Sequence, residues 1–195
     1  MKSSINGIFF TLTAVMFSIT STVRAGEPES EELLHSNMII KVEITINRPA
    51  SQVWPYLMDF GSYLKTDFIV KTVAGEPNKE GEVQRLYSTK IPLKEQEDKP
   101  GYFFKTIKIV PEKFWYGINP ATSSRNALHT GFNVLALIEN NGKTKVTYIG
   151  GKEATVSSKQ SYENAENGHQ ALVIDGTLRW EKDYLPRLKK LVEES

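Results

Sequence analysis

The sequence predicts an α+β fold in which a curved antiparallel sheet of six to seven strands surrounds a long C-terminal helix, with a short helix after the first strand. Three observations carry this prediction. Residues 40–46 alternate between apolar and polar side chains, the period of a strand with one buried face. Short apolar segments separated by turn residues follow, and such segments pair as antiparallel hairpins. Residues 168–194 then show the apolar spacing of an amphipathic helix.

A first helix is expected directly after the first strand. Residues 47–49, Asn-Arg-Pro, stop that strand, and either Asn47 or Ser51 can cap a helix whose first turn tolerates proline. Gly61 would end the helix. Its apolar face is spaced at i, i+4 and i+7 and consists of Val53, Leu57 and Phe60.

The middle strands are bounded by turn residues. The clearest turn is Asn140-Asn-Gly142, because Asn-Gly accepts positive φ at both central positions of a tight hairpin. In the strand that leads into this turn, Phe132 and Val134 share one face, which we expect to look toward the terminal helix. The strands cover residues 68–73, 82–89, 102–110, 113–119, 128–139 and 143–155.

The terminal helix must bury an apolar stripe, and the sheet is the surface available to it. Gly176 could break this helix, and Pro186 should kink it or divide it in two, because proline lacks the backbone N–H that a helix uses. The stripe repeats at spacings of 7, 3 and 4 and consists of Leu178, Leu185, Leu188 and Val192, widened by Trp180, Tyr184 and Leu191.

Length and composition limit the class of protein. A chain of 195 residues suits one ordinary domain, and a net charge of +1 gives no strong field toward nucleic acid. There is no cysteine, which excludes disulfide scaffolds, thiolate metal sites and cysteine nucleophiles. We expect residues 38–194 to form a single domain, preceded by a flexible acidic lead-in over residues 26–37.

The first 25 residues have the pattern of an export signal. Lys2 precedes a charge-free run over residues 3–23, and the small residues near Ala25 suit cleavage after it. An uncleaved membrane anchor is the alternative, although the strongly apolar part, about 12 residues, is short for a span. Cleavage would leave 22 of the 24 basic residues against all 23 acidic ones, and would place the protein in the periplasm or outside the cell.

Three segments carry a resemblance to a known superfamily: residues 42–54 (VEITINRPASQVW), 59–63 (DFGSY) and 184–193 (YLPRLKKLVE). Together with the order of elements over residues 38–194, they resemble the START-like superfamily of helix-grip proteins, often grouped with polyketide cyclases, plant pathogenesis-related class 10 allergens and coenzyme Q-binding proteins. The resemblance implies a cavity between sheet and terminal helix for an apolar or amphipathic small molecule, and concave apolar spaces are the usual ligand sites. A fully packed core is the alternative.

No catalytic or metal-binding set of residues stands out. The three histidines, His35, His129 and His169, lack metal-ligand spacing, so we expect no metal site. No phosphate-binding glycine loop and no Gly-x-Ser-x-Gly motif occurs, and no cofactor is expected. His129 could act as a general base if it pointed inward, but its strand parity opposes that of Phe132.

Large aromatic residues and one arginine are the candidate ligand contacts. Arg85 enters the cavity if Val83 and Tyr87 face inward, where it could hold a carboxylate or phenolate; it is solvated if Leu86 marks the inner face. Parity is ambiguous at residues 103–104, because one of the lysines that follow must emerge at an end or a bulge. For each ring, ordinary core packing is the alternative. The candidates are Arg85, Tyr87, Phe104, Tyr116, Phe132, Val134 and Trp180.

The sequence therefore predicts an exported protein that binds a small hydrophobic or amphipathic molecule, lipid-like or aromatic. We expect no nucleic-acid partner and no membrane span after signal cleavage. One alternative is an enzyme of the cyclase or aromatase kind acting on an aromatic or polyketide-like substrate, which the resemblance alone suggests. A second alternative is a module that contacts an envelope protein through a sheet edge or the acidic lead-in. Binding without catalysis is preferred, because no catalytic residues are identified.

Overall fold

The computed structural model of the protein describes residues 34–97, 99, 101–124, 127–156 and 159–195. The predicted signal peptide, residues 1–25, lies outside the described residues. The strands are β1 (Leu34–Ile46), β2 (Phe68–Ala74), β3 (Val83–Ser88), β4 (Tyr102–Val110), β5 (Phe114–Ser124), β6 (Ala127–Asn140) and β7 (Lys143–Val156). The helices are α1 (Ala50–Met58), α2 (Phe60–Tyr63), α3 (Lys94–Glu97), α4 (Lys159–Arg179), the π-helical turn η1 (Trp180–Tyr184) and α5 (Leu185–Glu193).

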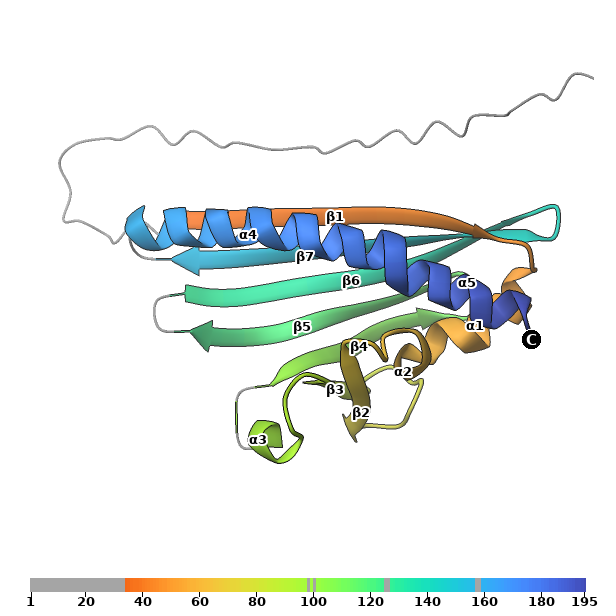
Figure 1. Cartoon of the computed structure of the whole chain (residues 1–195), viewed down its shortest axis with the longest axis horizontal. Helices are drawn as coiled ribbons and strands as arrows, with labels where there is room; N and C mark the ends of the chain where they lie inside the picture. The colour runs from red at the N-terminus through yellow and green to blue at the C-terminus, as the bar shows by residue number, and fades with distance from the viewer. Residues whose placement is uncertain (1–33, 98, 100, 125–126, 157–158) are drawn as a thin grey trace, which may run out of the picture. The chain divides into compact units, whose positions relative to one another are not determined.

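The seven strands form one antiparallel sheet in the order β1-β7-β6-β5-β4-β3-β2. The C-terminal helical segment runs along this sheet, and α1 and α2 lie beside its α5 end (Figure 1). The predicted α+β class, with a sheet that curves around a long terminal helix, is confirmed. All six predicted middle strands are present, and the one predicted over residues 113–119 extends to Ser124.

The first strand is longer than predicted. It begins at Leu34, whereas the domain was expected to begin at Met38. Residues 34–37 pair with residues 153–156 at the far end of β7. The inward alternation continues into this part of the strand with buried Ser36, a polar residue that hides the pattern in the sequence. The lead-in prediction is therefore wrong for residues 34–37.

Two predictions about strand irregularities are confirmed. Asn141 and Gly142, between β6 and β7, have φ of 52° and 69°, as the predicted tight hairpin requires. In β4 the pairing register shifts between Thr106 and Lys108, which is the expected bulge. Upstream of this bulge, Phe104 is buried on the inner face of the sheet.

The cap of α1 comes from a distant strand rather than from its own neighbours. The N-cap position is Pro49, which makes no side-chain hydrogen bond, so the prediction of Asn47 or Ser51 as the cap is wrong. Instead, the Ala50 N–H donates to Glu139 Oε2 at 2.8 Å. Glu139 lies near the end of β6, and its carboxylate satisfies an N–H that the helix itself leaves free.

The C-terminal helical segment is continuous through α4, η1 and α5. The break predicted at Gly176 is therefore wrong, and the predicted division at Pro186 takes the form of a π turn directly ahead of the proline. Ahead of Pro186 the backbone widens into the π turn, in which the Leu185 N–H donates to the Trp180 carbonyl. This wider turn accommodates the proline, whose ring and missing N–H disturb a regular α-helix. The extra residue also rotates the upstream stripe, so Leu178 is 42% exposed and not buried as predicted.

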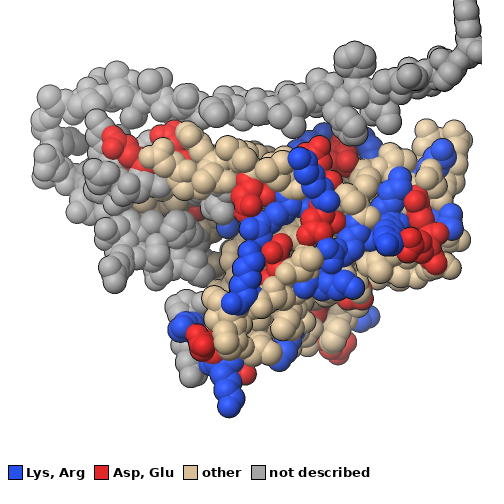
Figure 2. Space-filling model, viewed as in Figure 1, with Lys and Arg blue, Asp and Glu red and all other residues tan. Residues whose placement is uncertain are grey.

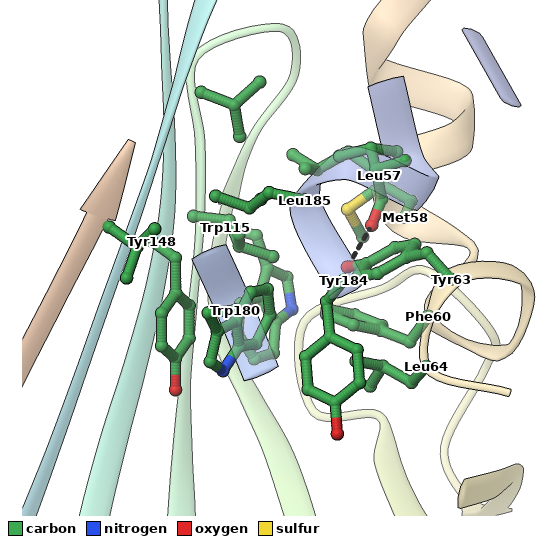
Figure 3. Close-up of a cluster of buried hydrophobic side chains, with 14 of the residues drawn as sticks. Leu57, Met58, Phe60, Tyr63, Leu64, Trp115, Tyr148, Trp180, Tyr184 and Leu185 are labelled. Carbon is green, nitrogen blue, oxygen red and sulfur yellow. Dashed lines mark hydrogen bonds between the residues drawn. The ribbon is translucent and has the colours of Figure 1, made fainter. Parts of the chain in front are cut away.

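A cluster of buried hydrophobic side chains lies where α1, α2, η1 and α5 meet the sheet (Figure 3). Phe60 meets Trp115 edge to face, with ring centroids 4.9 Å apart. The Tyr63 hydroxyl donates to the Leu57 carbonyl at 3.0 Å, drawn as a dashed line in Figure 3. Among the helices that the structure describes, none is long and apolar enough to cross a membrane.

Candidate ligand-binding cavity

A cavity of about 370 Å³ lies between the inner face of the sheet and the helical segment. Every strand contributes at least one residue to its lining, and the end of α4 and the turn η1 cover it. The predicted cavity beneath the terminal helix is therefore present, and the fully packed alternative does not hold. The residues from the helical segment are Asp175, Gly176, Arg179, Trp180 and Tyr184.

Most of the cavity wall is apolar. The side chains come from the four strands β1 to β4 and from the residue that follows α2. Walls of this kind favour a ligand with apolar surface, because both partners then remove that surface from water. These residues are Met38, Ile40, Leu64, Phe68, Leu86 and Phe104.

An aromatic stack joins the sheet to the helical segment. Tyr148 of β7 and Trp180 of η1 lie face to face, with ring centroids 3.6 Å apart and an angle of 12° between the planes (Figure 3). Tyr184 meets Trp180 edge-on at 5.2 Å. The Tyr148 ring lies over Gly150, where a Cβ would collide with the Tyr148 hydroxyl. Glycine inside this strand therefore serves a close approach of a ring to the backbone.

A line of hydrogen bonds crosses the inner face. The Tyr148 hydroxyl donates to Asn133 Oδ1 at 2.9 Å, and Asn133 Nδ2 donates to Asn119 Oδ1 at 3.0 Å. Asn119 Nδ2 in turn donates to the Phe103 carbonyl at 2.8 Å. The Trp180 side chain donates to the Tyr148 oxygen, which has two lone pairs and so keeps one that a ligand could use. Burial raises the pKa of Tyr148 well above its usual value, so the group stays a neutral phenol.

A charged rim ties the helical segment to the connection before β2. Arg179 Nη1 lies 3.1 Å from Asp67 Oδ2, and its Nε lies 2.8 Å from Asp175 Oδ2. The Tyr184 hydroxyl donates to the same Asp67 oxygen at 2.5 Å. The hydrogen bond that Arg179 donates to Asp175 raises the pKa of Arg179, so the guanidinium stays charged. Acidic and basic side chains alternate at this rim. They are also mixed over the face of the molecule seen in Figure 2.

Two of the seven predicted ligand contacts, Phe104 and Trp180, line the cavity. Arg85 and Tyr87 do not, because Leu86 is the residue of β3 between them that faces the cavity. This observation decides the alternative that the sequence left open.

Arg85 instead organises the connection between β3 and β4. Its guanidinium carbon lies 4.6 Å from the Tyr87 ring centre, so the two side chains share one face of the sheet. Its Nη1 donates to the Glu97 carbonyl and its Nη2 to the Lys99 carbonyl, each at 3.0 Å. The guanidinium thus binds backbone oxygens at the end of α3 and just beyond it.

Tyr116, Phe132 and Val134 lie on the convex face, so the prediction that Phe132 and Val134 face the terminal helix is wrong. The inward residues of β6 are Asn133, which lines the cavity, and Leu135, which is fully buried. Phe132 is half-buried because its ring lies over Gly151 in the neighbouring strand. Apolar residues therefore occupy both faces of β6, and parity alone could not distinguish them. The side chain of His129, which was expected to point outward, lies outside the described part of the structure.

Sequence reasoning missed the polar cavity residues. Asn119 and Asn133 each sit within an apolar strand, and Gly150-Gly151 interrupts β7. Polar residues at inward positions and paired glycines in a strand both indicate a ligand or a close contact. Recognising them requires the strand register, which pairs Asn133 with Gly150.

The comparisons with known proteins identify the fold. No family model matches the sequence, and no curated protein matches it. A protein of Mesorhizobium loti has a similar structure, with a TM-score of 0.55 and 10% identity over 81% of this chain and 98% of that one. The Zhui aromatase/cyclase from Streptomyces sp. R1128 gives 0.54 and 12% over 81% and 94%. Norcoclaurine synthase from Thalictrum flavum gives 0.52 and 11% over 83% and 89%. At these identities the likeness shows the fold alone, which is the START-like helix-grip fold.

Proposed function

We propose that this protein binds a small hydrophobic or amphipathic molecule in the cavity between its sheet and its helical segment, and that it does so outside the cytoplasm. The observation that carries the proposal is the apolar cavity of about 370 Å³. This volume is near the lower end of the roughly 300–1,000 Å³ typical of ligand pockets. It equals about a dozen water molecules at roughly 30 Å³ each, so a compact ligand fits better than a two-chain lipid.

Side-chain contacts at the rim and wall keep the cavity from collapsing. An empty space in a core costs stability in proportion to its volume, roughly 24 cal/mol per Å³. Here the rim contacts of Arg179 and Tyr184 with Asp67 hold η1 above the sheet, and the stack of Trp180 on Tyr148 fixes the wall. A ligand would supply the contacts that these side chains do not make with one another.

The polar groups indicate how such a ligand would be oriented. The Tyr148 oxygen can accept a hydrogen bond deep in the cavity, whereas Arg179 and Lys152 lie among the lining residues with charged heads. A molecule with an apolar body, a hydroxyl at one end and a polar or anionic group at the other would match both ends. The cyclase or aromatase alternative has less support, since the deep polar groups are a neutral phenol and two amides.

A matched pair of substitutions on β1 tests the proposal. Met38 lines the cavity, while its neighbour Ile39 points outward and is 64% exposed. The anionic dye 1-anilinonaphthalene-8-sulfonate should bind the wild type saturably. Met38→Trp should weaken this binding by about tenfold, because it fills the cavity, and Ile39→Trp should leave it unchanged. Equal loss or equal retention in both variants would contradict a ligand site in the cavity.

Export is proposed from residues 1–25 and has its own test. If the segment is a signal peptide, the protein recovered from its native cell should begin at Gly26. Intact-mass measurement of protein from the periplasm or medium would show this start. Protein that retains Met1 and sediments with membranes would instead support the anchor.

A further inference from the structure

We infer that a second, smaller pocket of this protein binds a primary ammonium group of a small organic cation. The pocket has a volume of about 230 Å³ and lies where the junction of α1 and α2 faces β2, β3 and the connection between these strands. It shares no lining residue with the larger cavity, and the inference does not depend on the function proposed for that cavity.

The first observation is a buried carboxylate without a counter-charge. Glu82 is 2% exposed. Its Oε1 accepts hydrogen bonds from the Thr72 hydroxyl at 2.6 Å and from Gln84 Nε2 at 3.1 Å, and its Oε2 accepts one from the Asn78 N–H at 2.8 Å. These donors are neutral, and within the described residues no basic side chain forms an ion pair with Glu82. A buried charge in this condition favours a cation beside it.

The second observation is an unpartnered buried acceptor in the same pocket. Gln84 is 8% exposed and lines the pocket. Its amide nitrogen is used on Glu82, and its Oε1 has no hydrogen-bond partner among the described residues. Buried polar atoms nearly always have a partner in folded proteins, so this oxygen lacks a donor that a ligand could bring.

A third acceptor completes the set. Asp59, between α1 and α2, also lines the pocket, and its carboxylate accepts the Ser62 hydroxyl. The residues that line the pocket therefore include two carboxylates and one unpartnered amide oxygen, and the Thr72 hydroxyl and the Gln84 amide nitrogen already donate to Glu82. The complementary ligand is positively charged and donates several hydrogen bonds.

An ammonium group fits this set better than a metal ion. Within the part of the chain described, no group of three or more His, Cys, Asp or Glu residues could hold a metal ion. Calcium takes roughly six to eight oxygen ligands, whereas an ammonium group has three N–H donors and suits a small set of acceptors. The rest of the lining includes Met58, Phe60, Val70 and Pro77, which would contact an alkyl chain.

Titration of ¹⁵N-labelled full-length protein with n-butylammonium chloride tests the inference. The backbone amide of Asn78 and the side-chain amide of Gln84 should shift saturably, because both bond the carboxylate that the ammonium would join. Tetramethylammonium chloride at equal ionic strength has no N–H donor and should cause no saturable shift, and neither should calcium chloride. Absence of saturation with n-butylammonium, or equal shifts with tetramethylammonium or calcium, would overturn the inference.

Three variants locate the binding. Asp59→Asn changes an exposed side chain and Gln84→Met replaces the unpartnered acceptor, so both should fold. Each should weaken n-butylammonium binding by about fivefold or more, since charge-assisted hydrogen bonds are roughly twice as strong as neutral ones. Glu181→Gln, at an exposed carboxylate of η1, should leave the affinity unchanged. Equal affinity in all three variants would refute the site, and unchanged dye binding by Asp59→Asn would show that the larger cavity is unaffected.

Discussion

One helical segment covers the inner face of the sheet, and the space beneath it is packed differently under α5 than under the end of α4. Under α5, Leu185, Leu188 and Val192 are each at most 1% exposed. At the end of α4, the residues that line the cavity are Asp175, Gly176 and Arg179. The covering helix therefore decides where the sheet is filled, because large apolar side chains on its inner face fill the space and small or polar ones leave it open.

The π turn separates these two ends. It shifts the stripe so that Trp180 and Tyr184 remain buried while Ile174 and Leu178 of α4 are 65% and 42% exposed. At Gly176 the helix comes close to β1, since a Cβ there would lie 2.7 Å from Ile40 Cδ1. The α4 end is thus held near the sheet by a glycine rather than by interdigitated leucines.

The largest expected effect is at the filled end. Leu188→Ala should lower the free energy of unfolding by about 2–5 kcal/mol, because it leaves a void among fully packed neighbours. Leu178→Ala is the matched control in the same helical segment and should change stability by about 0.5 kcal/mol or less. Urea denaturation monitored by far-UV circular dichroism measures both. Equal losses would contradict the contrast between the two ends.

The next effect concerns the wall of the cavity. Gly150→Ala places a methyl group where the Tyr148 hydroxyl lies, so the stack with Trp180 should be displaced. We expect a loss of about 1–3 kcal/mol in stability and weaker dye binding. Near-UV circular dichroism should report the displaced rings. As a control, Gly168→Ala lies in open space on α4 and should be neutral or stabilising, by up to about 1 kcal/mol.

A smaller effect is expected from the hydrogen-bond line. Tyr148→Phe keeps the ring stack but removes the donor to Asn133 Oδ1. Stability should fall by about 1–2 kcal/mol, because an acceptor on the inner face loses its partner. Ligands with a hydroxyl donor should lose more affinity than purely apolar ones of similar size, as calorimetry would show. Tyr102→Phe, at a partly exposed ring of the same cavity, should have little effect on this difference.

The contrast between the two ends explains what could be predicted from the sequence. The positions of the middle strands, the hairpin at Asn141-Gly142 and the packed stripe of α5 depend on local periodicity, and these predictions hold. The inward face of β6 depends on its pairing with β7, because apolar residues such as Val134 and Leu135 lie on opposite faces. Local periodicity carries no signal for that choice.

Other differences also arise from contacts between distant residues. The cap of α1 is Glu139, 89 residues away from the helix start at Ala50. The polar side chains of the cavity, Asn119 and Asn133, form one line only once β5 and β6 pair. Pro186 indicates a disturbed helix, but whether the backbone kinks or forms a π turn depends on what the turn packs against.

The smallest expected effect lies at the tip of the filled end, where Glu193 closes α5 onto the connection after β1. Its Oε1 accepts the Asn47 N–H at 2.8 Å, and this hydrogen bond holds the pKa of Glu193 below its usual value. A lowered folded-state pKa contributes stability above the unfolded-state value, near 4.3, which is lost as the pH falls through the folded-state value. Glu193→Gln should therefore lower stability at pH 7, and by only about 0.5 kcal/mol or less because solvent screens the charge. At pH 2–3 the substitution should have no effect, because the carboxylate is then protonated and uncharged. Urea midpoints across this range, with Glu194→Gln as the exposed neighbouring control, would measure the difference. A Glu193→Gln loss that persists undiminished at low pH would mean that side-chain packing, not the carboxylate charge, closes this end.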